Sequence, residues 1–195
     1  MHSVRLICGI LLLSALSVAA HAVPITFTET VVGSGSLGSA FSNQLITITG
    51  TGDTAGITSS VGVYQLVLPT ATLTVAGSSP VSFTGGLTVF SNTFAQVAGF
   101  MGLSPALDIL DTNSSAFATY ALLGAISGSG PATINSGTAF STSGGSFILN
   151  SITGSATFTA GAALIAATPE PTSLALLGTG LLAFTGAVRR KLCRA

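Results

Sequence analysis

Short runs in which apolar residues alternate with threonine or serine recur along this chain. Residues 25–32 read Ile-Thr-Phe-Thr-Glu-Thr-Val-Val, and residues 45–49 read Leu-Ile-Thr-Ile-Thr. Alternation with a period of two places successive side chains on opposite faces of a β-strand, so both runs predict half-buried strands. Further strands are predicted at 61–68, 70–76, 81–84, 87–90, 138–142, 146–149, 151–153 and 156–159.

Glycine and proline divide these runs. Residues 33–39 and 50–56 are predicted to be loops, because an ordered glycine is costly inside a strand. Pro69 lacks an N–H and is expected to break the strand between residues 68 and 70. Gly85-Gly86 predicts a two-residue hairpin turn between the strands on either side.

Two segments depart from simple alternation. Phe94, Val97, Ala98 and Met101 recur at helical spacing behind Asn92, a good N-cap, so one short helix is predicted here. Residues 116–126 are apolar on both faces, which predicts a central strand covered on both sides. Many short strands and one helix indicate an all-β sandwich or jelly-roll-like domain.

Glu29 is the one charge in phase with apolar neighbours, since it falls on the same face as Ile25, Phe27 and Val31. A ligand role is one interpretation. The other, which we favour, is an edge strand or strand end that is protected from unwanted pairing by an inward charge.

Composition excludes several classes of function. The chain has five basic residues, and between residues 23 and 168 there is no Lys, Arg, His, Cys or Trp. This excludes His- or Cys-based nucleophiles, imidazole or thiolate metal sites, phosphate clamps and a nucleic-acid surface. We expect no cofactor. The only acids in this region are Glu29, Asp53, Asp108 and Asp111, so an enzyme would depend on carboxylates alone.

Asp53 suits a turn, because its carboxylate can accept hydrogen bonds from nearby backbone N–H groups. Asp108 and Asp111 are followed by Thr112, Asn113, Ser114 and Ser115, which adds oxygen atoms. Calcium needs six to eight oxygen ligands, and the Asp-x-Asp-x-Asp-Gly loop is missing. The pair is a weak metal candidate, and a solvated turn is the favoured interpretation.

Residues 1–22 have the pattern of a secretory signal peptide. Arg5 precedes an apolar stretch from residue 6 to 18, and Ala20-His21-Ala22 forms a small-x-small cleavage site for signal peptidase. This predicts export of the residues that follow.

The C-terminal region combines three features in a fixed order. Pro169-Glu170-Pro171 forms an accessible spacer, since two prolines prevent regular structure. An uncharged run follows from residue 173 to 188. As a helix it would be about 24 Å long, which is short for a membrane core of about 30 Å. Its apolar and terminal residues are Ser173, Leu174, Leu176, Leu177, Leu181, Leu182, Phe184 and Val188. The basic end, expected in the cytoplasm, consists of Arg189, Arg190, Lys191 and Arg194.

Taken on its own, the uncharged run predicts a membrane anchor or a buried helix, and the basic end favours the anchor. The order of the three features resembles the PEP-CTERM sorting signal of bacterial exported proteins. The resemblance implies that an exosortase, a membrane transpeptidase-like enzyme, recognises Pro169, Glu170 and Pro171 and removes the tail. The chain is thus expected to comprise a signal peptide (1–22), an exported β-sandwich domain (23–167) and a sorting signal (168–195).

Three functions remain for the exported domain. The favoured one is a non-enzymatic protein of the cell surface or extracellular matrix, associated with a biofilm-type exopolysaccharide. The protein is expected to arrive there from an inner-membrane intermediate. The alternative is a carbohydrate- or calcium-binding surface module that uses Asp108, Asp111 and Tyr120. An enzyme with a carboxylate pair is the third. Between pH 5 and 9 nothing is expected to titrate unless Glu29 is buried.

Overall fold

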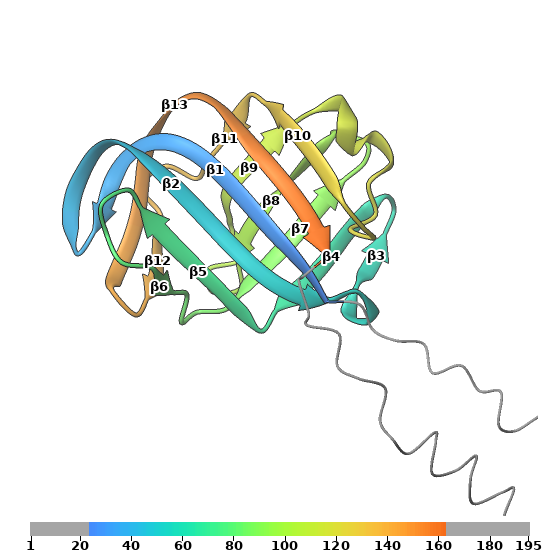
Figure 1. Ribbon diagram of the computed structural model, residues 1–195, viewed down its shortest axis with the longest axis horizontal. Helices are drawn as coiled ribbons and strands as arrows, with labels where there is room; N and C mark the ends of the chain where they lie inside the picture. Colours follow the sequence, from blue (N-terminus) through green and yellow to red (C-terminus); the bar gives the residue numbers. More distant parts are fainter. Residues whose placement is uncertain (1–23, 163–195) are drawn as a thin grey trace, which may run out of the picture. The chain divides into compact units, whose positions relative to one another are not determined.

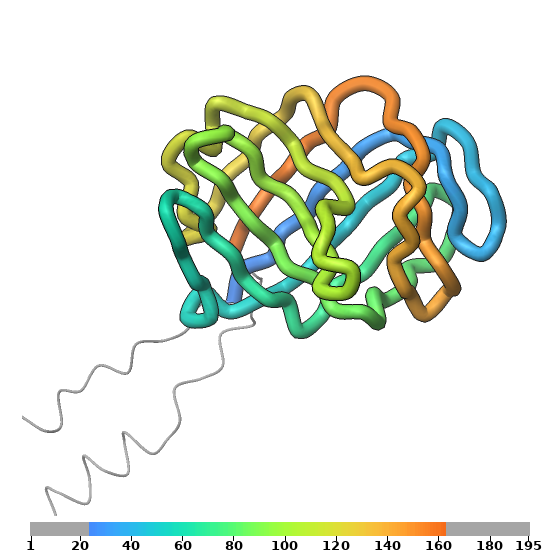
Figure 2. Tube along the Cα trace, turned by 180° about the vertical axis from the view of Figure 1, so that it is seen from behind, coloured from blue at the N-terminus to red at the C-terminus, as the bar shows by residue number. Residues whose placement is uncertain are grey.

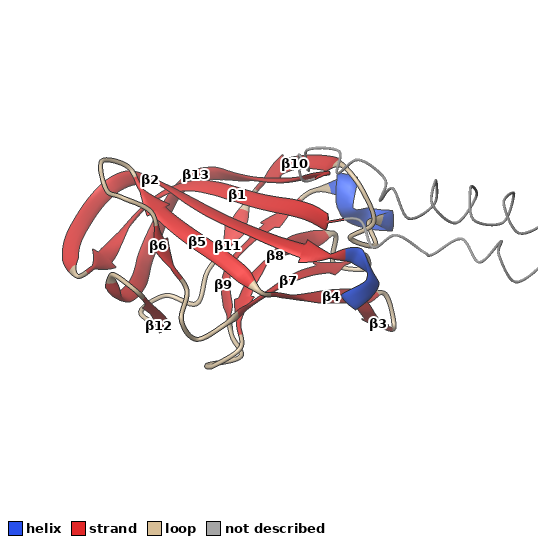
Figure 3. Cartoon of the chain, turned by 60° about the horizontal axis from the view of Figure 1, so that its bottom comes forward, coloured by secondary structure: helices blue, strands red, loops and turns tan. Residues whose placement is uncertain are grey.

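The computed structural model describes residues 24–162, which form two facing antiparallel sheets (Figures 1 and 3). Sheet A has the order β10-β13-β1-β2-β5-β6, with β12 also paired to β13, and sheet B has the order β11-β9-β8-β7-β4-β3. The strands of sheet A are β1 (Pro24–Leu37), β2 (Ser39–Asp53), β5 (Thr70–Val75), β6 (Val81–Ser82), β10 (Ile126–Gly130), β12 (Ala139–Thr142) and β13 (Gly145–Ala162). Those of sheet B are β3 (Thr58–Ser60), β4 (Val63–Leu68), β7 (Leu87–Asn92), β8 (Val97–Gly102), β9 (Asp108–Asn113) and β11 (Ala132–Thr133).

Two prolines mark the corners where a strand passes from one sheet to the other. β4 pairs with β7 in sheet B, and after Pro69 the chain continues as β5, which pairs with β2 in sheet A. β10 pairs with β13 in sheet A, and after Pro131 the chain continues as β11, which pairs with β9 in sheet B. Proline suits such a corner, because the chain there leaves one hydrogen-bonded ladder for another. The predicted break at Pro69 is confirmed.

These corners link the strands of the two sheets into one closed path. The path runs from β1 to β2, through β5 and β4 to β7, β8 and β9, and then through β11 and β10 to β13 and back to β1. Figure 1 shows the long strands of sheet A crossing those of sheet B at a large angle. The predicted all-β sandwich is confirmed, but its strands follow a meander and not the Greek-key order of a jelly roll.

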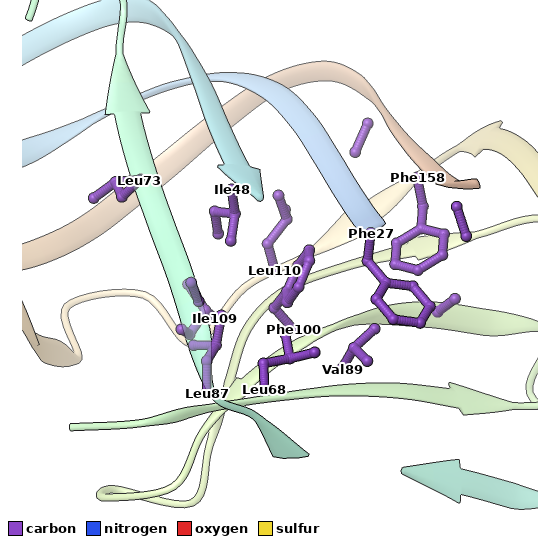
Figure 4. Close-up of a cluster of buried hydrophobic side chains, with 14 of the residues drawn as sticks. Phe27, Ile48, Leu68, Leu73, Leu87, Val89, Phe100, Ile109, Leu110 and Phe158 are labelled. Atoms are coloured by element: carbon purple, nitrogen blue, oxygen red, sulfur yellow. The ribbon is translucent and has the colours of Figure 1, made fainter. Parts of the chain in front are cut away.

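Aromatic side chains fill the space between the sheets. The ring of Phe158 lies 6.2 Å from that of Phe27, 6.1 Å from that of Phe100 and 5.6 Å from that of Phe117. All four are fully buried, and Figure 4 shows Phe27 and Phe158 next to each other, to the right of the labelled leucine and isoleucine side chains of the core. Burying an aromatic side chain is among the largest single contributions to a core.

The predicted helix at residues 94–101 is wrong, because this segment is the turn and second strand of the hairpin β7–β8. The Asn92 side chain does accept hydrogen bonds from the N–H groups of Phe94 and Ala95, both at 3.1 Å. An Asx turn makes the same bonds as a helix N-cap, and here Gln96, at φ 57°, turns the chain back into a strand.

The predicted central strand at residues 116–126 is also wrong. The segment begins as a 3-10 helix, η2 (Ser115–Thr119), and continues as a loop to β10. Its buried side chains are Phe117, Tyr120 and Leu122, a spacing that alternation cannot produce. The segment therefore packs only one side on the core, and Leu123 is 67 % exposed.

Several other predictions change as well, including the loop predicted at residues 50–56, whose first four residues belong to β2. Residues 33–37 continue β1, because Gly33 and Gly35 let β1 approach β13 where a side chain would collide with its backbone. Gly85-Gly86 joins no hairpin: β6 pairs with β5 in sheet A, whereas β7 belongs to sheet B. The three short strands predicted at residues 146–159 are one strand, β13, whose register shifts by a bulge opposite Val31.

Candidate functional site

Glu29 lies on the inward face of β1, between β13 and β2 in the middle of sheet A, and is fully buried. The prediction of an edge strand or strand end is therefore wrong, although the inward phase is confirmed. The hydroxyl of Thr112 on β9 donates a 2.7 Å hydrogen bond to Oε1, and Oε2 has no hydrogen-bond partner among residues 24–162.

Burial raises the pKa of Glu29 well above its usual value of 4.5, and the negative charge of Asp111 raises it further. The hydrogen bond from Thr112 acts in the opposite direction. With no cation in residues 23–168 to pair with, a carboxyl group in this position favours its neutral form. The expected absence of titration between pH 5 and 9 therefore does not extend to Glu29.

The part of sheet B that receives Glu29 is built from small side chains. Ser91, Ala98 and Thr112 are register neighbours on β7, β8 and β9, and all three are fully buried. Within the described part of the chain, the hydroxyl of Ser91 also has no hydrogen-bond partner. Glu29 is enclosed by the core, so it is not accessible to a substrate.

Asp108 and Asp111 both lie on β9, where a register shift against β8 separates them. Burial and the charge of Asp111 together raise the pKa of Asp108, so the two carboxyl groups lie close enough to interact. Oδ1 of Asp111 accepts hydrogen bonds from the backbone N–H of Thr133, at 3.1 Å, and from its hydroxyl. Within residues 24–162 no group of three metal-ligating side chains gathers anywhere.

Tyr120 does not provide the exposed platform that a sugar site would need. Its ring packs on Phe117 and Phe158, and it is 7 % exposed. Its hydroxyl donates a 3.3 Å hydrogen bond to the carbonyl oxygen of Gly124, and burial raises its pKa above the usual value. Tyr120 is therefore not available as an exposed aromatic contact for a sugar.

A cavity of about 320 Å³ lies beside the paired ends of β1 and β13. It is lined by Ile25, Thr54, Leu123, Gly124, Ala125 and Ala162. The single polar side chain in this lining belongs to Thr54, so the cavity offers neither a charge nor a converging set of donors.

Asp53 stabilises a turn, as predicted, because its Oδ1 accepts a 2.8 Å hydrogen bond from the N–H of Ala55.

The outward face of sheet A carries a regular array of hydroxyl groups. Alternate residues of β1, β2, β5 and β13 are buried apolar residues, glycines or Glu29, so the threonines between them point outward. The strand registers align them in three rows. The rows are Thr26–Thr51–Thr70, Ser127–Thr159–Thr28–Thr49–Thr72–Ser82 and Ser129–Thr157–Thr30–Thr47–Thr74. We call this surface the threonine face.

Hydroxyl groups of neighbouring strands on the threonine face bond to one another. The oxygen atoms of Thr26 and Thr51 lie 3.2 Å apart, and those of Ser129 and Thr157 lie 2.7 Å apart. Each hydroxyl has one donor and two acceptor positions, so capacity remains for a partner. The sequence predicted the outward threonines of single strands, but their alignment across strands depends on register.

Residues 167–191 match the family model of the PEP-CTERM protein-sorting motif. The chain carries a PEP-CTERM sorting motif. It is therefore an exported protein with a C-terminal sorting signal that an exosortase processes, and its sorting is linked to the membrane. No curated protein and no solved structure is significantly similar to the chain.

The sorting motif includes Pro169, Glu170 and Pro171, the apolar run and the basic residues up to Lys191. All of these, like the cleavage residues Ala20 and Ala22, lie outside the described residues, so their individual roles stay predictions. Within residues 24–162, no helix has the length and hydropathy needed to span a membrane.

Proposed function

We propose that this protein is a non-enzymatic component of the cell surface or extracellular matrix, associated with an exopolysaccharide layer. The observation that carries this proposal is the sorting motif at residues 167–191, which assigns the chain to an export and sorting route. The threonine face supports it, because a hydroxylated and uncharged surface suits a hydrated polymer network. The protein would pass through an inner-membrane intermediate before the exosortase releases it from its tail.

The positions of the carboxylates support a non-enzymatic role. Glu29 is enclosed between the sheets, and Asp53 is bound to the turn that follows it. Asp111 is 8 % exposed and is bonded to Thr133, which leaves Asp108 without a second free carboxylate beside it. A general acid and base must both reach the substrate, and no such pair is present within residues 24–162.

The same contacts weaken the alternative of a calcium-binding module. Asp108 and Asp111 supply two carboxylates, one of which has an oxygen committed to Thr133, whereas calcium takes six to eight oxygen ligands.

Fractionation of the producing cells tests this proposal. The protein should be recovered with the surface and matrix material in cells that have the exosortase. In otherwise identical cells that lack the exosortase it should remain with the inner membrane. Recovery in the inner-membrane fraction of both strains would contradict a surface or matrix role.

A further inference from the structure

We propose that the threonine face of sheet A binds a flexible, neutral polysaccharide chain. This inference rests on the proposed matrix function and assigns it a surface and a class of partner. The charge, area and curvature of the face together select that partner.

Charge excludes polyanions. Residues 23–168 contain no Lys, Arg or His, so an anionic polysaccharide finds no cation on the domain. Three of the four acids do not face the rows: Glu29 points into the core, and Asp108 and Asp111 are on β9 of sheet B. The fourth, Asp53, takes the next outward position of β2 after Thr51, just beyond the rows, and its Oδ1 accepts a hydrogen bond from the N–H of Ala55. An uncharged polymer meets no repulsion on this face.

Area argues against a second copy of the chain. Rows about 6.7 Å apart and strands about 4.8 Å apart give the threonine face an area of about 500 Å². A stable protein–protein interface buries about 800 Å² on each partner and has an apolar centre. The face is too small and too hydroxylated for such an interface, but it is large enough for several sugar units side by side.

Curvature argues against a rigid crystalline surface such as ice. Neighbouring strands in a sheet are rotated by about 20–25°, so the five strands from β10 to β5 accumulate roughly 80–100°. A flat lattice would meet only two or three of these strands, whereas a flexible chain can follow the twist. Figure 1 shows β1, β2 and β13 curving together across the front of the domain.

The chemistry of the face matches sugars. Threonine offers a hydroxyl that both donates and accepts, as sugar hydroxyls do, and a methyl group that packs on the C–H groups of a sugar ring. Its β-branched side chain is stiff, so the hydroxyls stay in place when a chain binds. No aromatic side chain lies in the three rows, so each contact is weak, and strong retention depends on many protein copies on one polymer.

Affinity electrophoresis tests the proposal. The protein purified from the cells that produce it is run in native gels that contain dextran, hydroxyethyl cellulose or alginate. We expect at least one neutral glucan to retard it and alginate to leave it unretarded. The variant Thr28→Val/Thr49→Val/Thr72→Val removes three central hydroxyls and keeps the branched shape, and its apparent Kd should rise at least about tenfold.

The matched control is Thr58→Val/Thr119→Val/Thr138→Val, which changes three threonines off the face and should alter the apparent Kd by less than about twofold. Thr49→Lys, in the middle of the array, provides a second test if the triple variant does not fold. We expect it to lose retardation by the neutral glucan. Melting curves verify that each variant is folded.

Four results would overturn the proposal: no retardation by either neutral glucan, equal retardation of the folded face variant and the wild-type protein, equal retardation by alginate, or a dimer that the face variant abolishes. Failure of this proposal can be distinguished from failure of the proposed function. If the protein is recovered with matrix material but no neutral glucan retards it, the proposed location stands and the threonine face is not its contact with polysaccharide. If dextran retards the protein but the protein stays in the inner membrane, the face binds glucan and the proposed location is wrong.

Discussion

The hydroxyl of Thr112 on β9 bonds to Oε1 of Glu29 on β1 and so connects the two sheets through the only fully buried carboxyl group of residues 24–162. The second oxygen of that group has no hydrogen-bond partner among the described residues. A neutral carboxyl group is tolerated in such a place far better than a carboxylate, because removing a charge from water is costly.

The stability of the domain should therefore depend on pH. The pKa of Glu29 is raised in the folded state, so the unfolded chain loses this proton at a lower pH than the folded one. Stability should be greatest below about pH 4 and should decrease as the pH rises, with Glu29 contributing at most about 1.4 kcal/mol per unit, until the pH passes the folded-state pKa. Asp108, with a pKa raised by burial and by Asp111, acts in the same direction. Urea unfolding between pH 4 and 8 measures this decrease.

Glu29→Gln is the control for this prediction. Glutamine keeps the carbonyl oxygen that accepts from Thr112 but cannot ionise, so most of the pH dependence should disappear. The variant should also be more stable than the wild-type protein at pH 8. Equal pH dependence in the two proteins would show that another group is responsible.

Phe147→Ala should destabilise the domain by about 3–5 kcal/mol, because it leaves a cavity in the core. Phe147 is fully buried and stacks on Phe41, with ring centres 6.4 Å apart. Phe94 is 76 % exposed, and Phe94→Ala should change the free energy of unfolding by less than about 0.5 kcal/mol. Chemical denaturation of both variants distinguishes them, and similar losses would contradict the core described here.

Gly130→Ala should destabilise the domain by about 1–3 kcal/mol. Gly130 precedes the corner at Pro131, and a Cβ there would collide with the carbonyl oxygen of Asn113 on β9. For Gly161 on β13, no atom of residues 24–162 lies within 4 Å of such a Cβ, so Gly161→Ala should be neutral. A neutral Gly130→Ala would mean that the corner is not closed as described.

Calcium should not stabilise the domain. Binding at a concentration a hundredfold above Kd would raise stability by about 2.7 kcal/mol, which a melting curve detects easily. We expect no shift in the melting temperature on addition of millimolar calcium. An increase of several degrees that Asp108→Asn removes would restore the calcium-binding alternative.

Local alternation was enough to predict the strands that hold the core. Residues 25–32 and 45–49 are strands with the predicted faces inward, because a period of two has one structural interpretation when one face is buried. The Pro69 break was predicted for a similar local reason. The position of Glu29 in mid-sheet was not, because the neighbours of a strand are set by the whole topology.

The errors occurred where one local pattern serves two structures. Asn92 makes the capping bonds of a helix and those of a hairpin turn, and only pairing of β8 with β9 decides between them. Gly33 and Gly35 indicated a loop, but they permit a close approach of two long strands. The threonine face was missed for a related reason: each Thr-x-Thr run is visible in the sequence, and the alignment of Thr28 with Thr49 and Thr72 is not.

The proposed surface location depends most on removal of the sorting signal during export. Intact mass spectrometry of the protein recovered from surface and matrix material tests this directly, with cells that lack the exosortase as the control. We predict a mass that excludes residues 174–195 in cells with the exosortase and a mass that includes them in cells without it. A protein recovered from the surface that still contains the apolar run and the basic end would contradict removal of the sorting signal.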